Sequence, residues 1–151
     1  MDAATYDEIM KRAIQSEIDA QKFYADVAAK VQGAHLKEMF TDFVDEEKRH
    51  ERILEGFRAK GASHLHFKDV PDFRVAETIE APKPSVEMKP ADALALAAKN
   101  EAAAMKHYTE LAAACSDPEQ KAVFEELAAM ERDHKNRMET AFIDIGYPEV
   151  W

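Results

Sequence analysis

The sequence predicts an all-α fold: an antiparallel four-helix bundle made of two helical hairpins joined by a long crossover. Only 4 of 151 residues are glycine, and Ala, Glu, Lys, Leu and Met are abundant, which favours helix over strand. Four segments repeat apolar residues at helical spacing, and a chain of this length suits one domain. We expect residues 1–151 to form one domain with hairpins at 5–60 and 89–145, a crossover at 61–88 and a short C-terminal tail.

The first hairpin begins with a predicted helix from about residue 5 to residue 31. Thr5 and Glu8 have the spacing of a capping box, in which each side chain binds the other residue's backbone N–H. Gly33 is expected to stop this helix in the left-handed region, and a second amphipathic segment runs to Gly61. The apolar face of the first helix contains Ile9, Ala13, Ile14, Ala20, Tyr24, Val27, Ala28 and Val31.

The second hairpin is marked by prolines that suit the first turn of a helix. Pro90 is expected to open a helix that ends near residue 114, and Asp117-Pro118 reads as the cap and first residue of the last helix. The connector between the two hairpins, residues 61–88, contains three prolines, and its apolar residues show no sustained periodicity. A bundle of two stacked hairpins requires such a crossover, and an exchange of hairpins between two chains would require it equally. The sequence leaves both arrangements open, and we expect a homo-oligomer, either a plain or a swapped dimer.

The charge distribution excludes several classes of partner. The formal net charge is -10 and no cluster of Lys or Arg is present, which argues against nucleic acid and anionic membrane surfaces. No stretch approaches the ~18 apolar residues of a membrane span, and the N-terminus lacks a signal-peptide apolar region. We therefore expect a cytoplasmic protein. The single cysteine, Cys115, excludes an internal disulfide and a Cys-x-x-Cys module within this chain.

The most informative feature is an internal repeat with a constant offset of 84 positions. Each half carries a glutamate and, thirty residues later, a Glu-x-x-His motif. The midpoint between the two glutamates falls in turn-like sequence, so a hairpin folded there brings both glutamates to one height. The residues Glu17, Tyr24, Phe40, Glu47 and His50 recur as Glu101, Tyr108, Phe124, Glu131 and His134.

These residue types in this pattern predict two metal ions. Ionised glutamates on apolar faces cost several kcal/mol each unless they are paired or bound to cations, and the sequence shows no Lys or Arg on the inner faces at their level. Two divalent cations balance four carboxylates, and two neutral imidazoles complete the coordination. Glu-x-x-His places both ligands one turn apart on one helix face. Oxygen and nitrogen donors suit iron, with manganese or zinc also possible.

Segments such as SEIDAQKFY and DEEKRHERIL resemble the ferritin-like superfamily, and within it the rubrerythrin-like and bacterioferritin-like branches. Di-iron carboxylate proteins of this superfamily carry such a ligand pattern, with a Glu from each of two helices and a Glu-x-x-His motif from each of the other two. The resemblance covers roughly residues 5–60 and 89–145 and implies a ferritin-like bundle with two iron ions. It implies that Glu47 and Glu131 bridge the ions, that Glu17 and Glu101 are terminal ligands, and that His50 and His134 each bind one ion.

The chain departs from these relatives in three ways. The position of an additional rubrerythrin glutamate, one turn after the ligand of the third helix, is Ala104 here, and the four cysteines of a rubredoxin domain are absent. The haem-binding methionine of bacterioferritins is replaced by Lys48, so no haem is expected. The chain also ends soon after the fourth predicted helix, without the short fifth helix common in ferritin cages.

The resulting expectation is a non-haem di-iron redox protein that oxidises Fe(II) or reduces oxygen or peroxide. Its electrons would come from a separate donor protein or from Fe(II) itself, because the sequence contains no second redox motif. Tyr24 and Tyr108 are candidates for hydrogen bonds that orient the ligand carboxylates, although they could equally be core aromatic residues. Two alternatives stay open: an iron-storage subunit of a larger oligomer, and a non-catalytic metal-binding scaffold or sensor.

Overall fold

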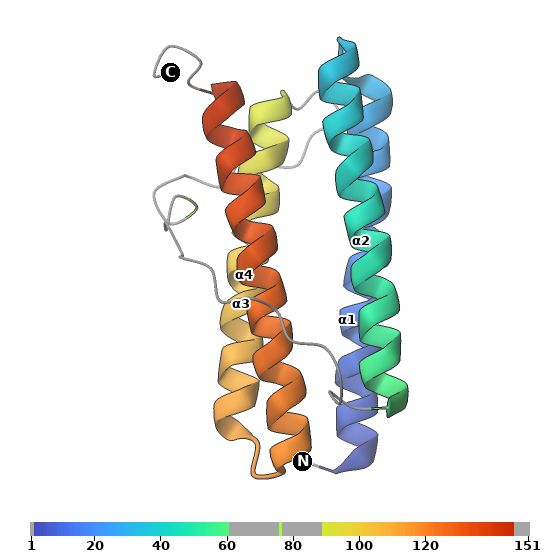
Figure 1. The fold of residues 1–151 in the computed structure, drawn as a ribbon, viewed down its shortest axis with the longest axis vertical. Helices are drawn as coiled ribbons and strands as arrows, with labels where there is room; N and C mark the ends of the chain where they lie inside the picture. The colour runs from blue at the N-terminus through green and yellow to red at the C-terminus, as the bar shows by residue number, and fades with distance from the viewer. Residues whose placement is uncertain (1, 61–75, 77–88, 147–151) are drawn as a thin grey trace. The chain divides into compact units, whose positions relative to one another are not determined.

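The computed structural model describes residues 2–60, 76 and 89–146, and this part of the chain is helical without any strand (Figure 1). The predicted fold class, all-α with the two hairpins of a four-helix bundle, is therefore confirmed. The predicted crossover at 61–88 lies outside the described residues except for Ala76. The helices are α1 (Ala3–Lys30), α2 (Ala34–Lys60), α3 (Pro90–Ala114) and α4 (Pro118–Gly146).

Helices α1 and α2 form the first hairpin, in the compact unit Met1–Ser63. The left-handed conformation predicted at Gly33 is confirmed, because its φ is 95°, which glycine adopts without steric cost. Helix α1 already ends at Lys30, however, where the C-cap Val31 is extended, so Gly33 forms the turn between the two helices and does not itself stop α1. The predicted capping box at Thr5 is wrong, because the helix begins two residues earlier. Asp2 is the N-cap, and its Oδ1 accepts a hydrogen bond from the Thr5 backbone N–H at 2.8 Å.

An ion pair joins the start of α1 to the end of α2. Arg58 Nε lies 2.5 Å from Asp7 Oδ1, and Lys11 Nζ lies 3.0 Å from Asp7 Oδ2. The hydrogen bond from Arg58, followed by that from Lys11, lowers the pKa of Asp7 to about 2. This pair connects the open ends of the hairpin at the exposed surface.

Helices α3 and α4 form the second hairpin, in the compact unit His64–Trp151. The predicted helix starts are confirmed: Pro90 lies in the first turn of α3 and Pro118 is the first residue of α4. Asp117 caps α4, because its Oδ1 accepts a hydrogen bond from the Glu119 N–H at 2.9 Å. The grouping of both hairpins into one domain stays a prediction.

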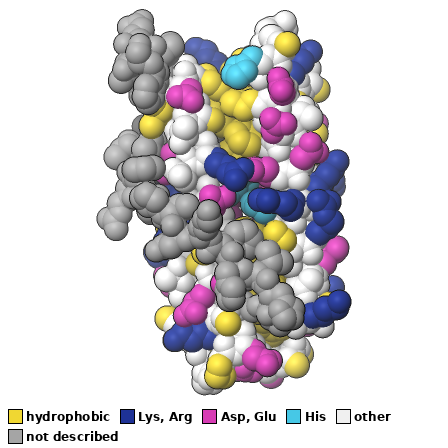
Figure 2. Space-filling view, viewed as in Figure 1, with side chains coloured by type: hydrophobic (Ala, Val, Ile, Leu, Met, Phe, Trp, Pro, Cys, Tyr) yellow, Lys and Arg dark blue, Asp and Glu magenta, His cyan; other side chains and the backbone are white. Residues whose placement is uncertain are grey.

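The helices separate a buried apolar side from a charged surface in each hairpin. In Figure 2, Asp and Glu side chains lie among Lys and Arg side chains over the helices. Within the described residues, no helix is apolar enough over a sufficient length to cross a membrane. The fully buried apolar side chains include Met10, Phe40 and Leu54 in the first hairpin and Leu94, Phe124, Leu127, Met130 and Met138 in the second.

Candidate metal centre

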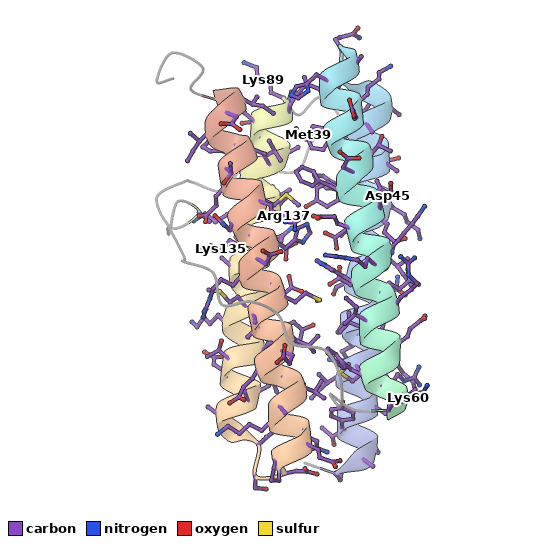
Figure 3. All side chains as sticks on the ribbon, in the orientation of Figure 1. Met39, Asp45, Lys60, Lys89, Lys135 and Arg137 are labelled. Carbon is purple, nitrogen blue, oxygen red and sulfur yellow. The ribbon has the colours of Figure 1, made fainter. Side chains whose placement is uncertain are left out.

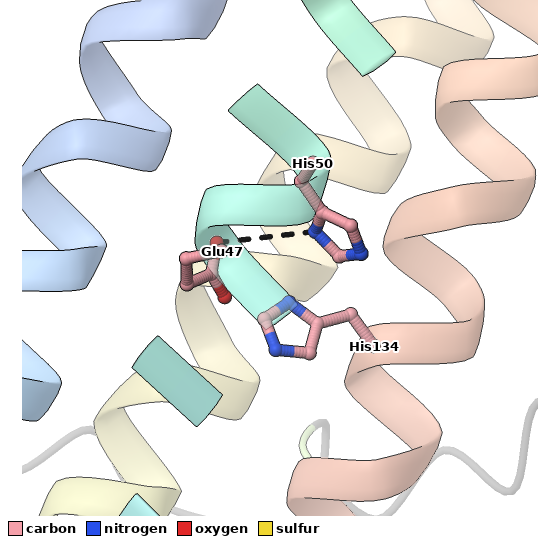
Figure 4. A group of neighbouring side chains, drawn as sticks. All are labelled: Glu47, His50 and His134. Carbon is pink, nitrogen blue, oxygen red and sulfur yellow. Dashed lines mark ion pairs between the residues drawn. The ribbon is translucent and has the colours of Figure 1, made fainter. Parts of the chain in front are cut away.

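The first hairpin gathers three of the predicted ligands. Glu17 comes from the middle of α1, while Glu47 and His50 lie one turn apart on α2 (Figure 4). Their exposed fractions are 6%, 1% and 2%, so all three polar side chains are buried. His50 Nδ1 lies 3.7 Å from Glu17 Oε2 and 3.9 Å from Glu47 Oε2. One imidazole nitrogen therefore faces one carboxylate from each helix.

The second hairpin repeats this arrangement with Glu101 on α3 and Glu131 and His134 on α4. These side chains are 8%, 3% and 1% exposed. His134 Nδ1 approaches Glu101 Oε1 to 3.0 Å, and one donor atom from each of the three residues lies within 4.8 Å of the others. Two donors that bind one divalent cation at about 2.1 Å each lie at most about 4.2 Å apart, and the 3.0 Å between His134 Nδ1 and Glu101 Oε1 is within this limit. The three residues together could hold a metal ion.

The donor chemistry also suits a hard or borderline cation. Each group offers two carboxylates and one imidazole, and neither contains a thiolate or an amide. Two carboxylates balance the charge of one divalent ion, which removes the cost of burying them ionised. The structure thus brings together the ligands predicted within each hairpin. The bridging roles of Glu47 and Glu131 and the terminal roles of Glu17 and Glu101 stay predictions.

A tyrosine stacks on a phenylalanine in each hairpin, at positions related by the sequence repeat. The ring centroids of Tyr24 and Phe40 are 6.4 Å apart, and those of Tyr108 and Phe124 are 6.5 Å apart. Both tyrosines are buried, at 2% and 6% exposure. These contacts confirm a packing role for Phe40 and Phe124, whereas hydrogen bonds from the tyrosines to ligand carboxylates stay a prediction.

Two buried charged residues of α4 were missed in the sequence. Lys135, which projects from α4 in Figure 3, is fully buried, and Glu139 is 1% exposed. Lys135 Nζ lies 3.9 Å from Glu139 Oε2, which also accepts a hydrogen bond from the backbone N–H of Ala76. Lys135 is therefore a buried cation one turn beyond Glu131, which the sequence analysis did not anticipate. The available signal was the spacing of Glu131, Lys135 and Glu139, which places alternating charges on one helix face.

The sequence profile of the Rubrerythrin family matches residues 8–142, which contain all six candidate ligands. The chain belongs to the Rubrerythrin family. The ferritin-like class inferred from the sequence is thereby confirmed, and the profile covers both hairpins. No rubredoxin domain accompanies the match.

A solved structure of a hypothetical protein from Pyrococcus furiosus is similar to this rubrerythrin-family chain. The two share 25% sequence identity with a TM-score of 0.60, and the match covers 91% of this chain and 87% of the other. No match was found among proteins of curated function. The comparisons therefore support the family and the fold, and the catalytic role has to be argued from the side chains.

Proposed function

We propose that this protein is a non-haem di-iron redox protein that oxidises Fe(II) or reduces oxygen or peroxide. One observation carries the proposal: each hairpin buries two carboxylates and one imidazole in a compact group, and both groups fall within the region matched by the family. Buried carboxylates in this number are tolerated best when cations balance their charge. Manganese or zinc in place of iron would fit the same donors.

The six side chains have distinct roles in this proposal. Glu17 and Glu101 would act as terminal ligands, His50 and His134 would each complete the coordination of one ion, and Glu47 and Glu131 would bridge the pair. When bound, two ferrous ions would supply one electron each for the reduction of oxygen or peroxide. The carboxylates would hold the ions and balance their charge, and the buried helix faces would exclude bulk water. Electrons for a further turnover come from a separate donor protein or from Fe(II) itself.

The experiment that tests the activity loads the metal-free protein with Fe(II) under anaerobic conditions. Oxidation of the bound iron is then followed optically after mixing with oxygen or with hydrogen peroxide. Fast oxidation by peroxide and slow oxidation by oxygen identifies a peroxidase, while the reverse identifies an oxidase or ferroxidase. Retention of many irons per chain in a large assembly would identify a storage protein. Absence of oxidation by both reagents refutes the redox function and leaves a metal-binding scaffold.

The ligand assignment is tested separately by iron content. Glu47→Ala and Glu131→Ala are each expected to abolish most of the loading, since a bridging ligand serves both ions. Glu55→Ala is the matched control, because Glu55 lies on the same face of α2 as Glu47, two turns further on, and is exposed. Two irons per chain in either bridging variant would show that the bridging assignment is wrong.

A further inference from the structure

The two hairpins carry the same ligands but differ in charge one turn beyond them. On α2, Glu47 is followed at four-residue steps by Glu51 and Glu55, so three acidic residues share one helix face. On α4, Glu131 is followed at the same steps by Lys135 and Glu139. Residues four apart on a helix are direct neighbours, with Cβ atoms about 6 Å apart. Glu51 is therefore the neighbour of Glu47 on α2, whereas Lys135 is the neighbour of Glu131 on α4.

The negative charge in the first hairpin is held in place by a residue of the other helix. Gln21, one turn beyond Glu17 on α1, donates a hydrogen bond from Nε2 to Glu51 Oε2 at 2.6 Å. This contact orients the Glu51 carboxylate at the level next to Glu17 and Glu47. The Glu51 side chain is half-buried, so water screens its charge only in part.

The positive charge in the second hairpin is buried more deeply. Lys135 is fully buried, and Glu139 is 1% exposed. The Lys135 ammonium pairs with the Glu139 carboxylate, since Nζ lies 3.9 Å from Oε2. The position equivalent to Gln21 is Met105, whose side chain has no N–H to donate a hydrogen bond. The Glu139 carboxylate lies 3.9 Å from the lysine Nζ and offsets part of the lysine charge.

From this difference we propose that the two cation positions are unequal and fill in order. The ligands of the first hairpin, Glu17, Glu47 and His50, bind the first cation tightly, because Glu51 adds negative charge beside them. The ligands of the second hairpin bind the second cation more weakly and exchange it faster, because Lys135 repels it. This inference rests on the proposed two-metal function and assigns Glu51 and Lys135 as positioning residues that set its order of filling. Opposite unit charges at neighbouring positions predict dissociation constants that differ by at least about tenfold.

Calorimetric titration of the metal-free protein with Co(II) measures both steps without relying on catalysis. The wild-type protein is expected to bind two Co(II) ions per chain in separate steps. His50→Ala should remove the tight step, and His134→Ala should remove the weak step. The visible spectrum of Co(II), which reports its ligands, provides a second readout of which position fills first.

Charge variants then test the cause of the difference. Lys135→Met keeps the side-chain length and should tighten the weak step at least about tenfold, so that the two steps merge. Lys135→Arg, which keeps the charge, should leave them separate. Because Lys135→Met could fail to fold, Glu51→Lys at a half-buried position provides an independent test and should weaken the tight step at least about tenfold.

Two outcomes overturn this inference while leaving the proposed function in place: equal affinities in the wild-type protein, or separate steps that respond to neither Lys135→Met nor Glu51→Lys. A wild-type protein that binds no divalent cation refutes the two-metal function itself. The two failures are therefore distinguishable in the same titration.

Discussion

Replacing the proposed ligand Glu47 by glutamine should make the metal-free protein more stable than wild type and the protein in excess metal less stable than wild type. Glu47 is 1% exposed, and one of its carboxylate oxygens lies within 3.9 Å of His50 Nδ1. Glu17 lies 3.7 Å from the same nitrogen, so these two carboxylates are at most about 8 Å apart. Two unit charges at about 8 Å repel by about 2 kcal/mol at an effective dielectric constant of about 20.

Glutamine has nearly the shape of glutamate and removes this repulsion. We therefore expect Glu47→Gln to raise the free energy of unfolding of the metal-free protein by about 1 to 2 kcal/mol. A cation present at 100 times its dissociation constant stabilises the wild-type protein by about 2.7 kcal/mol. The variant, which has lost a ligand, should gain much less. The order of stability should thus reverse between the two conditions.

Urea denaturation in chelator and in excess Mn(II) measures both free energies. The measurement is made at pH 8, where an ordinary carboxyl group is ionised and an ordinary imidazole is neutral. Glu55→Gln on the same helix is the control and should stay within about 0.5 kcal/mol of wild type in both conditions, since Glu55 is exposed. A Glu47→Gln variant that is less stable than wild type in chelator would contradict this reasoning. Charge repulsion between Glu17 and Glu47 would then not destabilise the metal-free protein.

Three further predictions concern stability. Asp7→Asn should lower stability at neutral pH, and this difference should disappear as pH falls from about 4 toward 2. The reason is that a carboxylate with a depressed pKa stabilises the fold above its unfolded pKa and loses that effect once it is protonated; acid unfolding in low and high salt measures the change. Phe124→Ala should cost about 3 to 5 kcal/mol in urea denaturation, because the ring is fully buried. Gly33→Ala should cost about 1 kcal/mol or more by the same assay: no atom would meet the added Cβ, and the cost comes only from the φ of 95°.

The helix boundaries were predictable where a residue restricts the backbone by itself. Pro90 and Pro118 begin helices as predicted, because the proline ring fixes φ. Gly33 has the predicted positive φ, which its missing Cβ permits, but it lies in the turn after α1 and not at the helix end. The start of α1 was placed too late, because two N-caps were available within a few residues. The sequence pattern at Thr5 does not reveal that Asp2 binds the Thr5 backbone N–H instead.

The clustering of the candidate ligands within each hairpin was predictable, because Glu-x-x-His spacing places both side chains on one helix face and the hairpin brings the other glutamate to the same level. Lys135 and Glu139 were not, because a charged residue beside a ligand is usually solvated, and its burial depends on what covers the helix. Only the structure shows that Glu139 accepts the backbone N–H of Ala76, from a segment far away in sequence. Patterns local to one helix cannot predict a contact of this kind.

Buried apolar positions differ between the two hairpins, whereas the buried glutamates and histidines are the same in both. At the offset of 84, Met10 corresponds to Leu94 and Leu54 to Met138, and all four side chains are fully buried. Apolar core positions thus tolerate exchange between side chains of similar volume, as close packing permits. The two glutamates and the histidine of each hairpin are repeated without exchange, although burying them costs more than burying any apolar residue. Because packing would favour their replacement, their repetition at both sites supports a requirement for their oxygen and nitrogen donors.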